Sequence, residues 1–597
     1  MPATISNKKR RSRSVLARFL VWRVKNIGDR NYILILSIIV GLASGCTALI
    51  LKTAVYHIHD LFLNHRFNTK DLLLLVYPVI GIALTVAFKK YILKDQIKHN
   101  ISSILHAISK RNSLMRAHKV FSSIFGGILT AGFGGSIGLE SPIISSGSAI
   151  GSNLGRVLRL NYKTVTLLLA CGAAGAISAI FNTPVAAIVF ALEVLLIDLT
   201  SFSLIPLLMA SASGAIVTRI FFEKEIVFHF TLIDDFQISH LPFYILLGII
   251  CGFISYYFTV SFLFVESKFE FIKKNRYRLI IGGLILGILV FLFPPLYGEG
   301  YEIVKQLLAG NHSEVFENSL YSSLSDNIWM PVFFFLVIIF LKVIATATTL
   351  GAGGIGGIFA PSIFTGSFTG FLFAHVFNAF EVGLSRSNFS LVGMAAVLAG
   401  VLHAPLTGVF LIAEITSGYE LIVPLMIATA ISFVTSKYLE PNSIFTMQLA
   451  KRGELITHHK DKAVLTFMEL RSVIETDLKT ISPDATLNDL VKVIAKSKRN
   501  IFPVVDDEGM LAGIVMLDNV REIMFDKSMY HTRVSNLMIL PPTYISSTDS
   551  MEVIMEKFKD SDAWNLPIID DGKYVGFISK SKLFTAYRNL LVEISEE

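Results

Sequence analysis

Long apolar runs separated by short polar stretches occupy the chain from about residue 32 to about residue 439, and from about residue 454 onward the pattern changes to that of a soluble domain. A helix that crosses a bilayer needs about 20 apolar residues. Runs close to that length are Ile33–Val55, Leu72–Ile92, Phe243–Val265, Leu279–Phe293 and Met330–Ala347. Because these runs do not alternate in polarity as barrel strands do, they predict membrane helices. We expect roughly ten to fourteen crossings.

Two pairs of similar segments indicate an internal duplication of this apolar part. PIISSGSAIG at Pro142–Gly151 shares its Pro, its Gly-Ser and its final Gly with PSIFTGSFTG at Pro361–Gly370. FNTPVAAIVFALE at Phe181–Glu193 matches LHAPLTGVFLIAE at Leu402–Glu414. The prolines of the first pair are 219 residues apart and those of the second pair 221, so both motifs recur in one order at nearly one offset.

The composition agrees with an integral membrane protein. It is 53% hydrophobic and 16% charged, whereas soluble domains are nearer to about a quarter charged. The net charge of +8 comes partly from a basic start and from basic loops such as Lys89–Lys119 and Lys273–Arg278. By the positive-inside rule these segments face the cytoplasm, so the charge requires no nucleic-acid partner. No short apolar stretch with a cleavage site follows the start, which we interpret as an uncleaved cytoplasmic arm.

The duplicated segments have features of an anion site. Pro142 and Pro361 each follow a glycine-rich approach and suit the first turn of a helix. A helix N-terminus presents unpaired N–H groups and the positive end of the helix dipole, which attract anions. Duplicated membrane domains with interrupted helices are typical of transporters. Glu140 is a costly carboxylate in this setting, so we predict that an anion passes between the two loops with Glu140 in its path.

Other functions remain open at this point. Gly and Ser also permit tight helix packing without a ligand. A divalent-cation transporter would need carboxylates such as Glu140, Glu193 and Glu414 as oxygen ligands, although the last two are related by the repeat and are expected to be structural. A membrane sensor that does not transport would leave Glu140 without a task. The three cysteines lie in apolar segments without metal-ligand spacing, and no nucleophile–base set indicates an enzyme, so we expect neither a metal site nor catalysis.

The two loops resemble signature motifs of the CLC chloride channels and chloride/proton exchangers, and the resemblance covers nearly the whole chain. The family's glycine-lysine/arginine-glutamate-glycine-proline motif corresponds to Gly138, Leu139, Glu140, Ser141 and Pro142. Its glycine-x-phenylalanine-x-proline motif corresponds to Gly357, Ile358, Phe359, Ala360 and Pro361.

The resemblance implies a homodimer with one pore per subunit that carries chloride, with nitrate or other small anions as further cargo. It implies that Glu140 is the gate. Its carboxylate would occupy the outer anion site and leave when it is protonated or displaced. The other residues of both motifs would shape the anion path, with the backbone N–H groups of Ile358 and Phe359 contributing to the anion site.

Three positions depart from the family pattern. Where the family has a serine that binds the central anion, an alignment over Lys98–Ser102 puts His99, and where it has a tyrosine in the last membrane helix, this chain has Phe445. A histidine lining the path would make anion binding depend on pH. Val194 replaces the inner proton glutamate of the exchangers, as in the family's channels, and a valine cannot relay protons. We therefore expect channel-like or loosely coupled conduction, with a chloride/proton antiporter as the alternative.

The tail contains a second repeat, since Asn500–Asn519 matches Asn565–Leu583. Each copy follows an amphipathic segment and has two apolar strands joined by an Asp-Asp turn, which suits a hairpin. The two copies resemble a tandem pair of cystathionine-β-synthase (CBS) modules. Such pairs often bind adenine nucleotides, for which Ser579 and Asp518 are the candidate contacts here, but the usual aspartate is missing. We expect no cofactor, with an adenine nucleotide as the alternative.

The expected fold is a polytopic α-helical membrane protein with a CLC-like inverted repeat, followed by an α/β tandem CBS domain. We place a basic arm at residues 1–30, the membrane domain at 31–446 with repeats of about 31–240 and 241–446, a linker at 447–468, and the CBS domain at 469–597 with modules of about 469–527 and 533–597. The protein is expected in the plasma (inner) membrane, with the N-terminal arm and the CBS tail in the cytoplasm.

Overall fold

The computed structural model describes residues 15–63, 73–94, 101–196, 200–221, 236–310, 315, 329–416, 418–450, 468 and 470–595. The chain divides into two compact units, Met1–Leu455 and Ile456–Glu597, which are described separately. The first unit is built from helices, and the second combines helices with two β-hairpins.

The first unit is a helical bundle. Its first half contains α1 Val15–Asn26, α2 Asp29–Leu63, α3 Leu73–Ala87, the π-helix η1 Phe88–Leu93, α4 Ile101–Lys110, α5 Lys119–Gly132, α6 Glu140–Val157, α7 Tyr162–Phe181, α8 Pro184–Glu193 and α9 Ser201–Phe221. Its second half contains η2 Ile238–His240, α10 Leu241–Phe271, α11 Asn275–Leu292, η3 Pro294–Leu296, α12 Tyr301–Leu308, α14 Trp329–Gly351, α15 Phe359–Asn378, α16 Arg386–Leu402, α17 Pro405–Ile415, α18 Ile422–Leu439 and α19 Ile444–Ala450.

Within the described residues, eight helical stretches are long and apolar enough to cross a membrane. This is fewer than the roughly ten to fourteen crossings expected from the sequence, because the interrupted apolar runs fold as pairs of helices. The run Val165–Leu196 breaks between α7 and α8 at Asn182, and Val392–Ile415 breaks between α16 and α17 at His403. Both residues adopt the left-handed conformation that ends a helix, with φ of 56° in each case.

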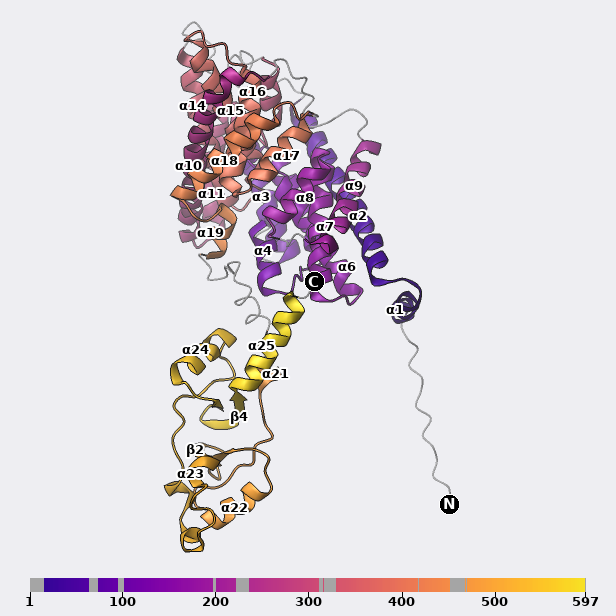
Figure 1. Ribbon diagram of the computed structural model, residues 1–597. Helices are drawn as coiled ribbons and strands as arrows, with labels where there is room; N and C mark the ends of the chain where they lie inside the picture. Colours follow the sequence, from indigo (N-terminus) through magenta and orange to yellow (C-terminus); the bar gives the residue numbers. More distant parts are fainter. Residues whose placement is uncertain are drawn as a thin grey trace. The chain divides into compact units, whose positions relative to one another are not determined.

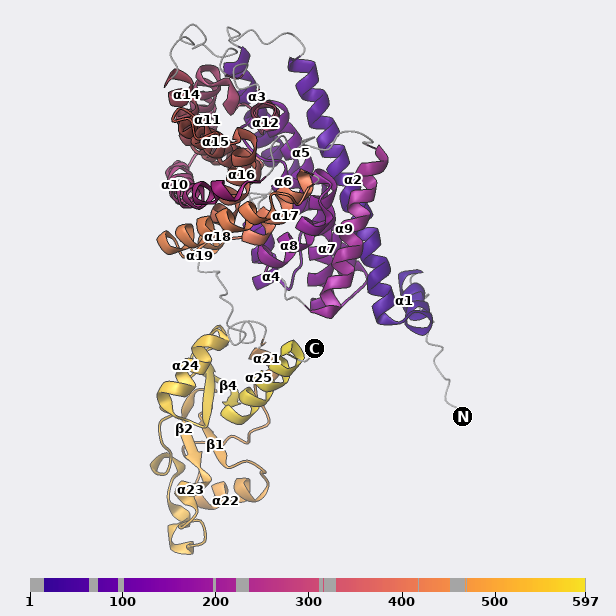
Figure 2. The same ribbon diagram turned by 45° about the horizontal axis from the view of Figure 1, so that its top comes forward.

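The internal duplication is visible in the helix packing. α6 packs against α7 as α15 packs against α16, and α2 packs against α9 as α10 packs against α18. Figures 1 and 2 show these helices gathered in two groups, with α2, α7 and α9 in one and α10, α15, α16 and α18 in the other. Gly147 meets the backbone of Gly172, and the equivalent Gly366 meets that of Gly393, leaving no room for a Cβ. The small residues therefore allow direct backbone contact between helices in both halves.

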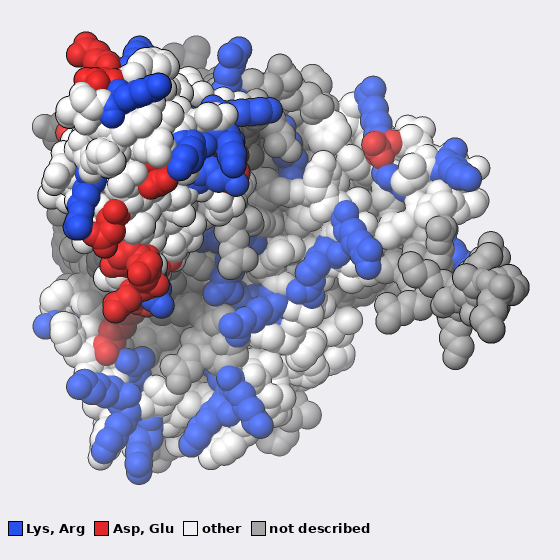
Figure 3. Space-filling view, turned by 90° about the horizontal axis from the view of Figure 1, so that it is seen from below, with Lys and Arg blue, Asp and Glu red and all other residues white. Residues whose placement is uncertain are grey.

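Basic side chains gather at η1 and at the turn between α10 and α11. They line a hollow of about 430 Å³ formed by Lys90, Lys273, Lys274, Asn275, Arg276 and Arg278. Arg278 also donates hydrogen bonds to the carbonyls of Ile272 and Glu270, and so closes the end of α10. Figure 3, a view from below, shows Lys and Arg at many points and Asp and Glu mainly in a band on the left of the picture.

The second unit contains the two hairpins expected from its repeat. Its elements are α21 Leu470–Val473, α22 Leu487–Ala495, β1 Ile501–Val505, β2 Leu511–Met516, α23 Leu517–Val520, η5 Lys527–His531, η6 Val534–Asn536, α24 Met551–Ser561, β3 Asn565–Asp570, β4 Lys573–Ser579 and α25 Lys580–Ser595. β1 pairs antiparallel with β2, and β3 with β4, each with a register shift near the turn.

The two modules of this unit contact each other through their hairpins. The turn of the first meets the second at the Met510–Lys573 bridge and through a 3.0 Å hydrogen bond from the Tyr574 N–H to the Gly509 carbonyl. A small shared core of Leu478, Ile501, Ile514 and Phe577 lies between them. The modules therefore form one folded unit.

Candidate functional site

The two signature loops meet at the junction of the repeats. Gly138 and Gly357 exchange both backbone hydrogen bonds, N–H to carbonyl at 2.9 Å in each direction, as an isolated antiparallel bridge. A Cβ on Gly138 would collide with the carboxylate of Glu140, and a Cβ on Gly357 would collide with Ser141. The close approach requires glycine at both positions, and it brings the starts of α6 and α15 together.

Glu140 is the first residue of α6 and is fully buried. Its carboxylate lies at the N-terminus of its own helix and is also faced by the backbone N–H of Ala360, in the first turn of α15. The first N–H groups of a helix have no partner within that helix, and they carry its positive dipole end. Two such helix ends therefore surround this one carboxylate, an arrangement that suits a negative charge from either the side chain or an anion.

Tyr301 at the start of α12 donates a hydrogen bond of 2.5 Å to Oε1 of Glu140. Nothing in the sequence motifs singled out this tyrosine, because it lies 161 residues from Glu140. It supplies a hydroxyl donor beside Glu140. A hydroxyl can also donate to a small anion in place of the carboxylate.

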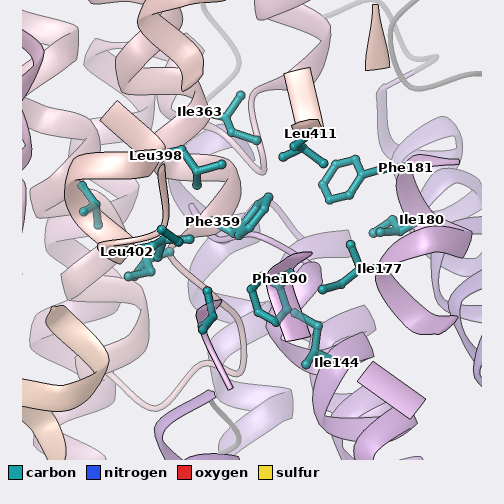
Figure 4. Close-up of a cluster of buried hydrophobic side chains, with 14 of the residues drawn as sticks. Ile144, Ile177, Ile180, Phe181, Phe190, Phe359, Ile363, Leu398, Leu402 and Leu411 are labelled. Atoms are coloured by element: carbon teal, nitrogen blue, oxygen red, sulfur yellow. The ribbon is translucent and has the colours of Figure 1, made fainter. Parts of the chain in front are cut away.

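Phe359 stands at the centre of the apolar packing between the repeats. Its ring lies 5.7 Å from that of Phe181 and 6.3 Å from that of Phe190, and Phe181 in turn meets Tyr301 at 6.3 Å. Figure 4 shows Phe359 among buried side chains from both halves, including Phe190 from α8 and Leu398 from α16. This aromatic cluster fixes the start of α15 next to Glu140.

Leu139, Ser141, Pro142, Ile358 and Ala360, the remaining path residues named by resemblance, are all buried at the same junction. Ser141 and Pro142 lie in the first turn of α6, and Pro142 also packs against Gly127 of α5. The sequence motifs therefore come together around one site, and their roles in conduction stay a prediction.

Glu193 and Glu414 have a reciprocal structural arrangement. Glu193, at the end of α8, accepts hydrogen bonds from the N–H groups of Leu406 and Thr407 and from the Thr407 hydroxyl, at 2.8 to 3.1 Å. Glu414, on α17, accepts from the N–H groups of Val185 and Ala186 at 3.0 and 2.8 Å. Each carboxylate thus caps the N-terminus of the other repeat's helix, which matches the expectation that these acids are structural.

Val194 follows Glu193 directly and is buried, with 5% of its surface exposed. Its N–H closes the last turn of α8 on the Phe190 carbonyl at 2.9 Å. The position aligned with the inner proton glutamate is therefore an apolar side chain in the core of the bundle. Among the residues that the structure describes, no group of three His, Cys, Asp or Glu side chains could hold a metal ion.

His99 lies outside the described residues, so its predicted place in the path stays open to experiment. The neighbouring Ile101 and Ser102 begin α4 and are buried. Ser102 donates a hydrogen bond of 2.5 Å to Gln448 of α19, the helix that carries the buried Phe445. α4 and α19 therefore pack on each other.

Glu299 and Lys342 are charged residues near Glu140 that the sequence analysis missed. Glu299 interacts electrostatically with Glu140, Lys342 and Lys52. Lys342 is fully buried, and its Nζ donates to the carbonyls of Gly298 at 3.0 Å and Leu296 at 3.5 Å. A signal was present, since Lys342 is the one charged residue in the apolar run Met330–Ala347, and an isolated charge in a membrane segment is a candidate functional group.

The candidate nucleotide contacts of the tail have other partners. Ser579 donates a hydrogen bond of 2.7 Å to Glu475, which also pairs with Arg499 at 2.7 Å. Asp518 pairs with Arg521 at 2.6 Å on the surface. The Ser579 hydroxyl and the Asp518 carboxylate thus each have a partner within the protein, and their role as nucleotide contacts stays a prediction.

Comparison with known proteins agrees with this geometry. Residues 80–437 match the family described as voltage gated chloride channel, and residues 470–526 and 534–589 match the CBS domain. The chain belongs to the CLC family. Its fold is that of a CLC membrane domain followed by α/β CBS modules. The protein is an integral membrane protein. Its activity is CLC-type chloride transport, not enzymatic catalysis.

Relatives of this CLC protein carry different descriptions. It is 30% identical to a putative chloride channel protein ClcB-like of Ralstonia nicotianae over 64% of this chain and 86% of the relative. It is 27% identical to the H(+)/Cl(-) exchange transporter ClcA of Yersinia pestis, over 70% of this chain and 87% of the relative. The chloride channel protein CLC-f of Arabidopsis thaliana is 25% identical over 82% of this chain and 69% of the relative.

Solved structures share the fold. A slow cyanobacterial Cl-/H+ antiporter aligns with a TM-score of 0.62 at 23% identity, covering 72% of this chain and 99% of that one. A eukaryotic CLC transporter aligns with a TM-score of 0.56 at 17% identity, covering 92% and 97%. The second alignment extends beyond the membrane unit, as expected for a chain with a CBS tail.

Proposed function

We propose that chloride passes between the N-termini of α6 and α15 and that the Glu140 carboxylate gates this path. The observation that carries the proposal is the position of Glu140, which is fully buried, bonded to Tyr301 and faced by the Ala360 N–H. A carboxylate and a chloride ion compete for the same donors. Protonation of Glu140 removes its charge, which frees the helix ends for the anion.

The second part of the proposal is that chloride movement is channel-like or only loosely coupled to protons. Its support is Val194, an apolar and buried residue at the position aligned with the inner proton glutamate. The neighbouring Glu193 is held by three hydrogen bonds and does not offer a free carboxylate. The descriptions of the relatives include both a chloride channel and an exchanger, so a chloride/proton antiporter is the alternative.

Two other functional classes have less support. A divalent-cation transporter would need several oxygen ligands at one place, but Glu193 and Glu414 each cap a helix of the opposite repeat. A membrane sensor without transport would leave Glu140 at a site suited to anions without a purpose. Both classes predict an absence of chloride flux, which the experiment below tests.

Assembly, cargo and orientation are proposed from the resemblance to the family. The protein is a homodimer with one path per subunit, and nitrate or other small anions share the chloride path. It lies in the plasma (inner) membrane with both termini in the cytoplasm. The basic hollow of Lys90, Lys273 and Arg276 supports this orientation, since basic residues accumulate on the cytoplasmic side.

The test is a simultaneous recording of chloride and proton flux from liposomes that contain the purified full-length protein, together with Glu140→Ala and Val194→Glu. We expect native chloride flux without uphill proton movement under a chloride gradient. Glu140→Ala should conduct chloride without dependence on pH, because its path has no gate carboxylate. Val194→Glu introduces a carboxylate where a proton relay is expected, and it should add measurable proton movement.

Uphill proton pumping by the native protein, abolished in Glu140→Ala, would reject the channel-like proposal and establish an exchanger with a different inner proton route. An absence of chloride flux in all three proteins would reject Glu140-gated conduction itself. Folding is checked in each case by size-exclusion chromatography in detergent.

A further inference from the structure

Glu299 is held in a defined position beside the gate. It lies in a turn between Gly298 and Gly300, whose φ angles of +60° and +89° favour glycine. Lys342 donates a 3.0 Å hydrogen bond to the Gly298 carbonyl and lies 4.6 Å from the ring centre of Phe364, and a Cβ on Gly300 would collide with that ring. The turn is thus packed from the α14 and α15 sides, and Glu299 has little freedom to move.

Glu299 belongs to a cluster of four charges. It interacts electrostatically with Glu140 of α6, Lys52 of α2 and Lys342 of α14. Two carboxylates and two ammonium groups balance, as is required of charges buried in a membrane protein. One additional proton gives this cluster a net positive charge, which attracts an anion to the position that Glu140 leaves.

Glu299 and Glu140 differ in their access to water. Glu140 is fully buried, whereas residue Glu299 as a whole is only partly buried. Tyr301, two residues after Glu299, contacts Glu140 through its hydroxyl and is itself influenced by both carboxylates.

We propose that Glu299 is a proton-binding group that acts together with Glu140, so that this pair sets the pH dependence of chloride passage. The proposal rests on the proposed gating role of Glu140. An ionised Glu299 favours protonation of Glu140 because two like charges in a poorly polar site repel each other. Once Glu299 is protonated, that repulsion ends. The positive charges of Lys52 and Lys342 instead favour the ionised form of both carboxylates.

Other titratable groups also face this region. Nε2 of His59 in α2 donates a hydrogen bond of 2.9 Å to the Ala131 carbonyl, and its ring lies 5.8 Å from that of Tyr297 in a tilted arrangement. Glu302 of α12 pairs with Lys305 at 2.8 Å and is exposed, with 82% of its side chain accessible. Glu302 provides a matched control, since it carries the same charge three residues away but is paired and points into solvent.

The experiment measures chloride efflux from liposomes as a function of external pH for the native full-length protein and for Glu299→Gln, Lys52→Met, Glu302→Gln and Glu140→Gln. We expect Glu299→Gln to move the midpoint of activation by about one pH unit to lower pH. Lys52→Met should move it to higher pH, because a positive charge is lost. Glu302→Gln should leave it in place. Opposite shifts are the signature of electrostatics, since damage to the fold has no reason to follow the sign of the charge.

The inference is rejected if Glu299→Gln keeps the native midpoint, or if it shifts in the same direction as Lys52→Met. If Glu299→Gln does not fold, the test rests on Lys52→Met. An activation midpoint of Lys52→Met equal to that of the native protein then rejects the proposal. Failure of the gate proposal looks different, because Glu140→Gln would then retain the native pH dependence. Loss of pH dependence in Glu140→Gln with no shift in Glu299→Gln rejects only the role of Glu299.

Discussion

Two pairs of glutamates in the membrane unit illustrate two ways to keep a carboxylate inside a helical bundle. Glu193 and Glu414 are related by the duplication, and each accepts backbone hydrogen bonds from the helix start of the other repeat. Glu140 and Glu299 are not related by it. Glu140 has a hydroxyl donor, Tyr301, and Glu299 has the two lysines Lys52 and Lys342 as charge partners.

The two pairs differ in how firmly hydrogen bonds hold each carboxylate in place. Backbone N–H groups at a helix start cannot move away, so Glu193 and Glu414 stabilise the contact between the halves. Glu140 is bonded by the Tyr301 hydroxyl and also faced by the helix start of α15, and under the proposed function an anion can take its place there. The duplicated pair therefore stabilises the bundle, and the proposed gate lies where the two halves differ.

The largest effect is expected from removing a fixed carboxylate. Glu193→Ala deletes the acceptor of three hydrogen bonds from the start of α17, two of them donated by backbone N–H groups. Since part-buried donors lose a charged partner, we expect a loss of about 2 kcal/mol or more in stability. The measurement is thermal unfolding of the full chain in detergent.

Glu414→Ala serves as the matched variant, with two hydrogen bonds lost instead of three and hence a smaller shift. In both variants, the protein that remains folded should keep the native pH dependence of chloride flux. A changed pH dependence at native stability would contradict the assignment of this pair to structure.

A medium effect is expected from Tyr301→Phe, which removes the one hydroxyl that bonds Glu140 and keeps the aromatic contact with Phe181. A hydrogen bond to a charged group is worth about 1.5 kcal/mol or somewhat more. We expect chloride flux at neutral pH to rise by about tenfold, because the deprotonated carboxylate leaves the site more readily. Thermal stability should change little, in contrast with Glu193→Ala. A lower flux would indicate that the hydroxyl serves the anion and not the gate.

The smallest effect concerns a carboxylate outside the membrane unit. Asp549 pairs with Lys557 at 2.6 Å. Partial burial alone would raise the pKa of Asp549, but hydrogen bonds from Lys557 and the Ser546 N–H hold it below its ordinary value. The pair therefore stabilises the fold above the pKa of an unfolded aspartate, about 3.9, and this contribution is lost as the pH falls through the lowered value.

Lys557→Met should cost about 1 kcal/mol or less at pH 7, with a difference from native that shrinks between about pH 5 and pH 2. The measurement is urea unfolding of the full chain followed by Trp564 fluorescence, with Trp22 and Trp329 replaced by phenylalanine. A difference that grows toward low pH would contradict the assignment.

Sequence reasoning identified those parts of the site that local pattern encodes. The equal offsets of Pro142 to Pro361 and Pro184 to Pro405 implied that the two loops are equivalent, and the Gly138–Gly357 bridge brings them together. The helix breaks and the two tail hairpins were likewise encoded by Gly, Pro and Asp at turns. These features depend on neighbours in the chain, which a sequence displays directly.

The remaining features depend on contacts between distant segments. Tyr301 reaches Glu140 across 161 residues, and Lys342 reaches the Glu299 turn across 44 residues to Gly298. No periodicity records such contacts. The hydrogen bond from the Ser579 hydroxyl to Glu475 was missed for the same reason, since Glu475 lies 104 residues away.

The most direct test of the gate is chloride efflux from liposomes at external pH values between about 4.5 and 8, in native protein and in Glu140→Gln. The native flux should rise as the external pH falls, because protonation takes the Glu140 carboxylate out of the anion site. Glu140→Gln should conduct at a high and constant level over the same range. A native pH dependence that persists in Glu140→Gln would contradict the central claim that this carboxylate controls chloride passage.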